Sequence, residues 1–107
     1  MSLQSMPNEH KLNASIFREH LHTRFKVAGA DSVELELVEV QEHPSGPKLE
    51  CYSLLFQGPI SLRIPQGTHR LEHTALGELE IFLTAVSGNQ SGFTYESVFN
   101  RFRKQEP

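Results

Sequence analysis

The stretch of residues 33–40, VELELVEV, constrains the fold of this chain more than any other. Apolar and acidic side chains alternate along it, and a period of two is typical of a strand with one buried and one solvated face. The alternation slips at Leu37-Val38, after which Val38 and Val40 flank Glu39. One extra residue that exchanges the two faces of a strand is a β-bulge. The stretch therefore predicts a strand with a bulge or sharp bend near Leu37-Val38.

Five further segments have the composition of short strands, and turn signals separate them. Residues 43–48, HPSGPK, contain two prolines and a glycine, which exclude regular structure, and residues 88–92, GNQSG, have the composition of a hairpin loop. Several short strands divided by turns indicate an antiparallel all-β domain. The additional predicted strands are residues 24–27, 50–57, 68–72, 79–86 and 93–102.

Residues 14–21, ASIFREHL, form the one helix that the pattern predicts. Asn13 or Ser15 offers an N-cap, and Phe17 and Leu21 share one helical face because they are four residues apart. Two turns of helix are unstable alone, so this face must dock on the strands. The predicted fold is therefore all-β and mainly antiparallel, a small six-stranded barrel or sandwich with one short N-terminal helix.

The chain of 107 residues is long enough for one domain. We expect a flexible arm at residues 1–12, a single β domain at residues 13–103 and a tail at residues 104–107. The predicted core combines the helix face with one side of each strand. It comprises Phe17, Leu21, Phe25, Val27, Leu35, Leu37, Tyr52, Leu54, Phe56, Leu71, Leu79, Ile81, Leu83, Tyr95 and Phe99.

Charge, cysteine content and hydropathy exclude several classes of protein. The formal net charge is −3, and the one basic cluster, Arg101, Arg103 and Lys104, has the character of a solvated tail. The single cysteine, Cys51, fits a reducing compartment. No apolar run approaches the roughly 18 residues that a membrane helix needs, and the N-terminus lacks the apolar region of a signal peptide. We expect a cytoplasmic protein with no nucleic-acid and no membrane partner.

Two histidines, His69 and His73, lie four residues apart in the stretch IPQGTHRLEHTALG, residues 64–77. The helical zinc-protease motif needs a glutamate directly after the first histidine, and HRLEH lacks it. Gly67 and Thr68 favour a strand, on which the two histidines lie about 13 Å apart, too far for one metal ion. We interpret His73 as a polar anchor that hydrogen-bonds the backbone at the end of this strand.

No other residue pattern indicates catalysis or a cofactor. Cys51 has no Cys–His motif, no serine lies in G-x-S-x-G, and no glycine-rich phosphate loop is present. His20 and His22 flank Leu21 and do not converge on a helix. The sequence predicts no catalytic residue, metal ligand or cofactor, although a composite site built from distant histidines stays open.

Five blocks carry a resemblance to a known family: RFKV (24–27), VELELVEV (33–40), YSLLFQGP (52–59), PQGTHRLEHTALGELEIFL (65–83) and YESVFNRF (95–102). On these blocks the chain resembles a family of small uncharacterised bacterial proteins, a domain of unknown function about one hundred residues long. The resemblance covers roughly residues 15–102 and departs from the expected pattern at His69, Thr74 and Thr84-Ala85. It implies bacterial origin and no assigned activity, and it offers no catalytic residues to carry over to this chain. It also implies occurrence near phage-tail-like collar proteins, which suits an accessory of such an assembly.

The block at residues 65–83 has a physical explanation in backbone geometry. Pro65 restrains the chain and Gly67 leaves it permissive at a turn, while Gly77 permits a turn between the fourth and fifth strands. Gly58-Pro59 ends the third strand. These residues, with His73, are predicted to serve the fold.

Several apolar residues face away from the predicted core. The alternation leaves them on the opposite side of the third, fifth and sixth strands: Leu55, Phe82, Val86, Val98 and Phe102. A contiguous apolar patch of several hundred Å² on a protein surface usually meets a partner. The N-terminal helix could cover such a patch instead, but it has two strong apolar side chains, too few to fill the core as well.

We therefore expect a non-enzymatic, self-associating or partner-binding module. The specific expectation is a homodimer, or a higher symmetric oligomer, with Phe82 and Val98 at the interface. A small-molecule-binding β-barrel is the alternative, and a hydrolase with a composite histidine site is the weaker third interpretation. A barrel that encloses a ligand typically has about eight strands, whereas six leave room mainly for side chains.

Overall fold

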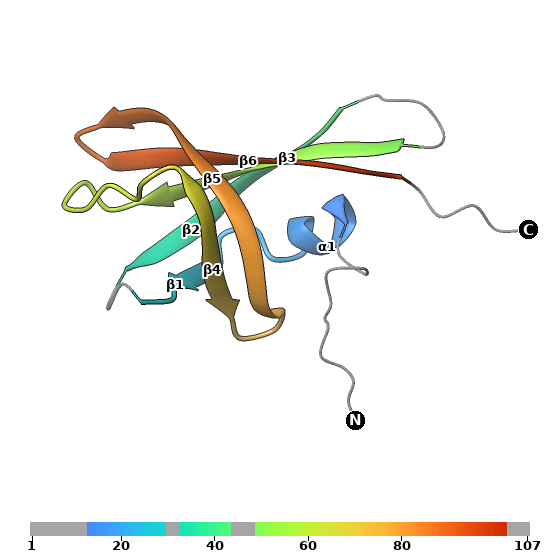
Figure 1. Ribbon diagram of the computed structural model, residues 1–107, viewed down its shortest axis with the longest axis horizontal. Helices are drawn as coiled ribbons and strands as arrows, with labels where there is room; N and C mark the ends of the chain where they lie inside the picture. Colours follow the sequence, from blue (N-terminus) through green and yellow to red (C-terminus); the bar gives the residue numbers. More distant parts are fainter. Residues whose placement is uncertain (1–12, 30–32, 44–48, 103–107) are drawn as a thin grey trace, which may run out of the picture.

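The described part of the chain, residues 13–29, 33–43 and 49–102 of a computed structural model, contains one short helix and six strands (Figure 1). The predicted arm at residues 1–12 and tail at residues 104–107 lie outside the described residues. The elements are α1 (Ala14–Arg18), β1 (Arg24–Val27), β2 (Glu34–His43), β3 (Leu49–Gly58), β4 (Gly67–His73), β5 (Gly77–Asn89) and β6 (Gly92–Phe102).

All strand pairs are antiparallel, and they close into a barrel in the order β1-β2-β3-β6-β5-β4. The all-β antiparallel prediction is confirmed, and of its two alternatives the structure is the barrel. One long strand makes closure possible, because β5 changes partners along its length. Residues 77–83 of β5 pair with β4, and its second half, from Thr84 onward, pairs with β6 (Figure 1).

Two bulges bend the strands around the barrel. In β2 the register with β3 shifts between Leu37 and Glu39, which confirms the bulge that the sequence predicts. In β5 the register with β6 shifts between Ala85 and Ser87. The second bulge was not predicted, because the alternation of apolar residues in β5 shows no comparable slip before its end.

The β5–β6 hairpin is tighter than predicted. Residues 88–92 have the composition of a loop, yet Asn89 pairs with Gly92 and only Gln90 and Ser91 form the turn. The Asn89 side chain supports this turn by accepting a hydrogen bond from the Ser91 backbone N–H at 2.7 Å. Local composition identified the turn, but the cross-strand pairing set its length.

Helix α1 is shorter than predicted. Asn13 caps it, because its side-chain oxygen accepts a hydrogen bond from the Ile16 N–H at 2.9 Å, but the helix ends at Arg18. The chain then turns, and at His22 φ is +67°. In place of the last predicted helical turn, the N–H groups of His20 and Leu21 donate to the carbonyls three residues before them, at 2.9 and 3.4 Å, and the next N–H, that of His22, donates to the Leu37 carbonyl of β2 at 2.6 Å.

The interior of the barrel is filled by the predicted apolar residues. All of the predicted core is buried except Leu21 and Phe99, which are partly buried and pack against it. Leu21 is not fully buried because the helix stops before reaching it. The sequence missed five members of the core, in the helix, in β2 beyond its bulge and in the segments between strands, namely Ala14, Val33, Val40, Ile64 and Leu76.

Aromatic rings join α1 to one end of the barrel. The Phe17 ring is fully buried, with its centroid 6.1 Å from the centroids of both Tyr52 and Phe99. Tyr52 and Phe99 stack with centroids 5.0 Å apart. The helix therefore packs on the inner face of β3 and β6, beneath the part of the sheet that extends past the barrel (Figure 1).

Candidate functional site

The imidazole of His73, at the end of β4, is held by hydrogen bonds on both ring nitrogens. Its Nδ1 accepts from the backbone N–H of Ala75 at 3.0 Å and of Leu76 at 3.2 Å. Its Nε2 lies 2.9 Å from Oγ1 of Thr23, whose single hydroxyl proton is donated to the His20 carbonyl at 2.6 Å. Because that proton is used, Nε2 must be the donor, which assigns the neutral Nε2–H tautomer.

The surroundings of His73 favour this neutral form. Burial lowers the pKa of His73 below its ordinary value, and His20, whose ring centroid lies 4.9 Å away, lowers the pKa further. The ring also packs on Phe25, with centroids 4.4 Å apart. A protonated Nδ1 would face two N–H donors, so the neutral ring is the one that the site fits. With both nitrogens occupied and 7% of the residue exposed, His73 has no atom left for substrate.

Among the described residues, His20 is the histidine whose ring contacts His73, and the other histidines have separate partners. Nε2 of His69 lies 2.7 Å from the Pro65 carbonyl, and Nδ1 of His22 lies 3.1 Å from a Glu36 carboxylate oxygen. Within the described ranges, no three His, Cys, Asp or Glu side chains are grouped so that they could hold a metal ion. Of the composite histidine site that the sequence left open, the structure therefore brings together one pair, His20 and His73, and His73 is the residue that anchors the turn.

A serine–histidine pair lies on the outer face of the sheet. Nε2 of His43 is 3.0 Å from Oγ of Ser53, within reach for a general base and nucleophile. Ser53 is 1% exposed, so a substrate carbonyl has no access to its hydroxyl. Cys51, which is opposite His43 in the β2–β3 register, is free and partly buried. The pair satisfies a buried hydroxyl and does not form a hydrolytic centre.

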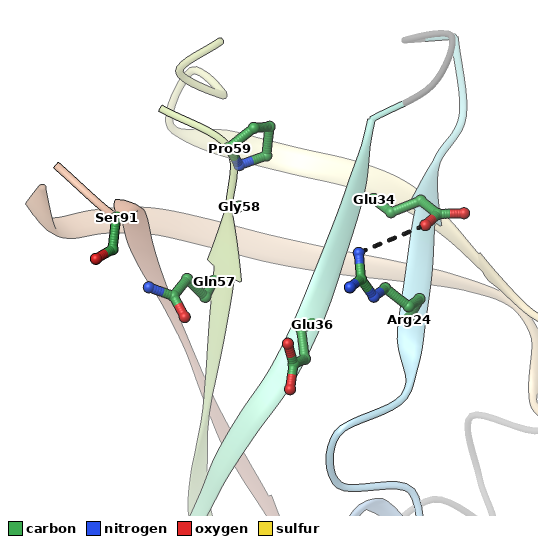
Figure 2. A pocket seen from close by; sticks show the side chains of 7 residues that line it. All are labelled: Arg24, Glu34, Glu36, Gln57, Gly58, Pro59 and Ser91. Atoms are coloured by element: carbon green, nitrogen blue, oxygen red, sulfur yellow. Dashed lines mark ion pairs between the residues drawn. The ribbon is translucent and has the colours of Figure 1, made fainter. Parts of the chain in front are cut away.

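A polar groove lies on the outside of the barrel beside the β5–β6 turn (Figure 2). It has a volume of about 310 Å³ and is lined by Arg24, Glu34, Glu36, Gln57, Gly58, Pro59 and Ser91. Its charged side chains already have partners, because Arg24 lies 3.8 Å from Glu34 and a Glu36 carboxylate oxygen lies 3.1 Å from Nδ1 of His22. The groove is open and shallow, which makes it a weak candidate for a small-molecule site.

The sequence did not indicate this groove, because its walls come from distant segments. Gly92 brings the β5–β6 turn against β3: its φ is +138°, and a Cβ there would collide with the carbonyl oxygen of Gly58. That close approach carries Ser91 to the rim beside Pro59. Gly92 and Gly58 are distant in the sequence, so the local pattern around each glycine does not show that they meet.

The outer surface of β5 and β6 exposes large apolar side chains. Phe82 is 50% exposed, Val86 is 49% exposed and Val98 is 56% exposed. Thr84 pairs with Glu96, and Phe82 and Val98 each lie two residues beyond that pair on the same face. We call this set, Phe82, Val86 and Val98 with the half-buried Leu55, the β5–β6 outer surface.

The helix does not cover the β5–β6 outer surface. Leu55 pairs with Glu96 and shares its face, while Phe17 of α1 contacts Tyr52 and Phe99, which belong to the opposite, inner face. Val86 lies at the bulge of β5. Phe102, the remaining predicted member, ends β6, and its side chain lies outside the described part of the chain.

The predicted turn residues lie at strand ends. Gly67 begins β4 with φ +147°, directly after the turn that contains Pro65, and Gly77 begins β5 with φ +79°. Gly77 pairs with His73, so the turn between them holds the two N–H groups that His73 accepts. These residues shape the end of the barrel and present no free functional group.

Comparisons with known proteins give a family and no activity. No helix among the described residues is long and apolar enough to cross a membrane. No curated protein and no solved structure matches the chain. One family model, described as a domain of unknown function (DUF6916), matches residues 12–99, which include every strand of the barrel except the last three residues of β6. The chain belongs to this family of domains of unknown function.

Proposed function

We propose that this protein is a non-enzymatic module that associates with a second copy of itself through the β5–β6 outer surface. The observation that carries the proposal is the exposure of Phe82, Val86 and Val98, each about half accessible, on one side of neighbouring strands. Isolated exposed apolar residues are common on monomers, whereas a group of them on one face usually meets a partner. A two-fold dimer is the commonest arrangement among soluble oligomers.

The two other candidate sites support this choice by being already satisfied. His73 uses both ring nitrogens within the chain, and in the polar groove Arg24 is paired with Glu34 while Glu36 contacts His22 outside it. A small-molecule-binding barrel has less support, because aromatic rings occupy the interior. Phe25 and Phe56, for example, meet edge to face with ring centroids 5.3 Å apart.

The setting that we propose is the bacterial cytoplasm, where the module would act as an accessory of a phage-tail-like assembly. The free thiol of Cys51 is compatible with a reducing compartment. The bacterial and assembly parts of this proposal depend on the family resemblance. Isolation of the protein under native conditions, with identification of what accompanies it, tests them.

Light scattering coupled to size exclusion, at micromolar protein, tests self-association. We expect a dimeric mass for the parent protein and a monomeric mass for Phe82→Lys and Val98→Lys. Leu62→Lys is the matched control, because Leu62 is 45% exposed but lies in the loop between β3 and β4. A monomeric parent contradicts self-association. A dimer that survives both surface variants places the interface on another face and contradicts the role of the β5–β6 outer surface.

A further inference from the structure

One edge of β6 lacks a neighbouring strand over its second half. The β5–β6 ladder runs from the hairpin only as far as Thr84 opposite Glu96, after which β5 leaves to pair with β4. The β3–β6 ladder continues to the end of β6, where Leu49 pairs with Phe102. Residues 97–102 are therefore paired on one side, and no other described residue forms a ladder with their second side (Figure 1).

The pairing pattern identifies which backbone groups face this open edge. Asn89 and Gly92 close a two-residue hairpin loop, so Gly92 directs its N–H and C=O toward β5. The β3–β6 register is unbroken along β6, so every second residue after Gly92 points the same way. That alternation directs the backbone groups of Val98, Asn100 and residue 102 to the open edge.

We infer that β6 of a second copy pairs antiparallel with this edge, about a two-fold axis at Asn100. The inference rests on the proposed self-association and names the contact that forms it. Paired edges would join the sheets of the two copies into one continuous sheet, in which main-chain hydrogen bonds supply affinity. An antiparallel pair of identical edges can be related by an exact two-fold axis, the commonest symmetry of soluble oligomers, whereas parallel pairing of the same edges requires an offset between the two copies and is not two-fold symmetric.

Backbone geometry selects the register. Only residues that face the edge can exchange hydrogen bonds, so the even-numbered residues of one copy must oppose even-numbered residues of the other. An axis at Val98 would bring the second copy onto Glu96, which already pairs with Thr84. With the axis at Asn100, Val98 of one copy lies opposite residue 102 of the second copy, and the Asn100 residues of the two copies lie opposite each other. In this register all three edge-facing residues form hydrogen bonds with the second copy. If the axis were moved by one residue, only two of them would.

Two features beside the edge favour its use as an interface. Open strand edges are usually protected by proline, by lysine or by inward charges, yet the edge sequence SVFNRF contains no proline and one charge. The half-exposed Val98 lies on the edge itself, and Phe82 lies where β5 leaves β6. Pairing of the edges would therefore cover the side of Val98 that lies along the edge as well as satisfy the backbone.

The first test compares Asn100→Pro with Asn100→Ala by light scattering at matched concentrations. The Asn100 N–H points away from β3, so proline removes an edge donor and no β3–β6 hydrogen bond, a position where strands tolerate proline. We expect the apparent mass of Asn100→Pro to be half that of the parent, while Asn100→Ala keeps the parent mass. Circular dichroism confirms that both variants remain folded.

The second test does not depend on proline being tolerated. Asn100→Cys is placed in a Cys51→Ser background, because Cys51 lies opposite Asn100 in the β3–β6 register. Opposed Cα atoms of a hydrogen-bonded antiparallel pair are about 5.5 Å apart, within the range for a disulfide. We expect oxidation to yield a covalent dimer, and Ser91→Cys at the exposed hairpin turn to stay uncrosslinked in the same background.

The outcomes separate this inference from the proposed function. A dimer that is lost in Phe82→Lys or Val98→Lys but retained in Asn100→Pro, without crosslinking at residue 100, overturns the edge pairing and leaves self-association standing. A monomeric parent overturns both. Loss of the dimer in Asn100→Pro with crosslinking at residue 100 supports the edge pairing and the two-fold axis together.

Discussion

The turn after β4 and the open edge of β6 satisfy their backbone polar groups in opposite ways. After β4, the buried ring of His73 accepts hydrogen bonds from two successive N–H groups, at 3.0 and 3.2 Å. Along β6, the N–H and C=O groups of Val98 and Asn100 face an edge that no described strand pairs with. The first region has no capacity left for a partner, and the second has both hydrogen-bonding capacity and exposed apolar surface.

The difference teaches that residue type is a poor guide to function in this chain. Histidine is the residue most often associated with catalysis and metal binding, yet His73 serves the fold. Valine and phenylalanine usually serve the core, yet Val98 and Phe82 lie at the surface that we assign to association. Substitutions should therefore separate the two regions, because one set should change stability and the other should change assembly.

The largest effect on stability is expected at the helix end of the barrel. Phe17→Ala removes a fully buried ring that contacts Tyr52 and Phe99, and it should lower the free energy of unfolding by about 4 kcal/mol. Urea denaturation measures it. The exposed neighbour Ser15→Ala is the control, with an expected change within about 0.5 kcal/mol. An equally small loss for Phe17→Ala would mean that α1 does not contribute to the core.

The next effect is expected at the anchor. His73→Ala leaves two backbone N–H groups without their acceptor, which should lower the free energy of unfolding by about 2–3 kcal/mol. His73→Asn, whose side-chain oxygen can replace Nδ1 as acceptor, should lose less. His69→Ala, which removes one exposed hydrogen bond, is the control. Equal stability of His73→Ala and His69→Ala in urea denaturation would refute the anchor role.

A smaller effect is expected from pH. The pKa of His73 is lowered in the folded state by burial and by His20, while in the unfolded chain it is about 6.5. Below that pH, His73 is protonated in the unfolded chain but stays neutral in the folded protein. The stability that is fully present above pH 6.5 is therefore lost as the pH falls toward the lower pKa of the folded state. Urea midpoints between pH 7.5 and 5 should show this decline, and His73→Asn should flatten it. An unchanged slope in that variant would assign the decline to other groups.

The smallest effect on intrinsic stability is expected at the β5–β6 outer surface. Val98→Lys and Phe82→Lys replace exposed side chains, so unfolding at protein concentrations low enough to give monomers should change by about 0.5 kcal/mol or less. At concentrations where the parent is dimeric, its thermal midpoint should rise with concentration and those of the variants should not, by mass action. If both variants lost the same amount of stability at every protein concentration, these residues would belong to the fold and not to an interface.

The period-two pattern by itself determined most of the strands and the core. Alternation along residues 33–40 located β2 and its bulge, because each side chain of a strand is directed by its immediate backbone. The same alternation placed Phe82 and Val98 on the outward side. Asn13 was recognisable as one of two N-caps because capping is a contact over three residues.

Tertiary structure alone decided how the strands share partners and where side chains meet. Thr23 and His73 are 50 residues apart, so their hydrogen bond, which assigns the tautomer, has no trace in the local sequence. The helix ended at Arg18, and the His22 N–H beyond it bonds to the Leu37 carbonyl of β2, a contact between segments that local sequence does not reveal. The open edge of β6 exists because β5 divides its length between two neighbours. Side-chain periodicity is a local property, whereas the choice of pairing partner depends on register between distant segments, and that register is set only when the barrel closes.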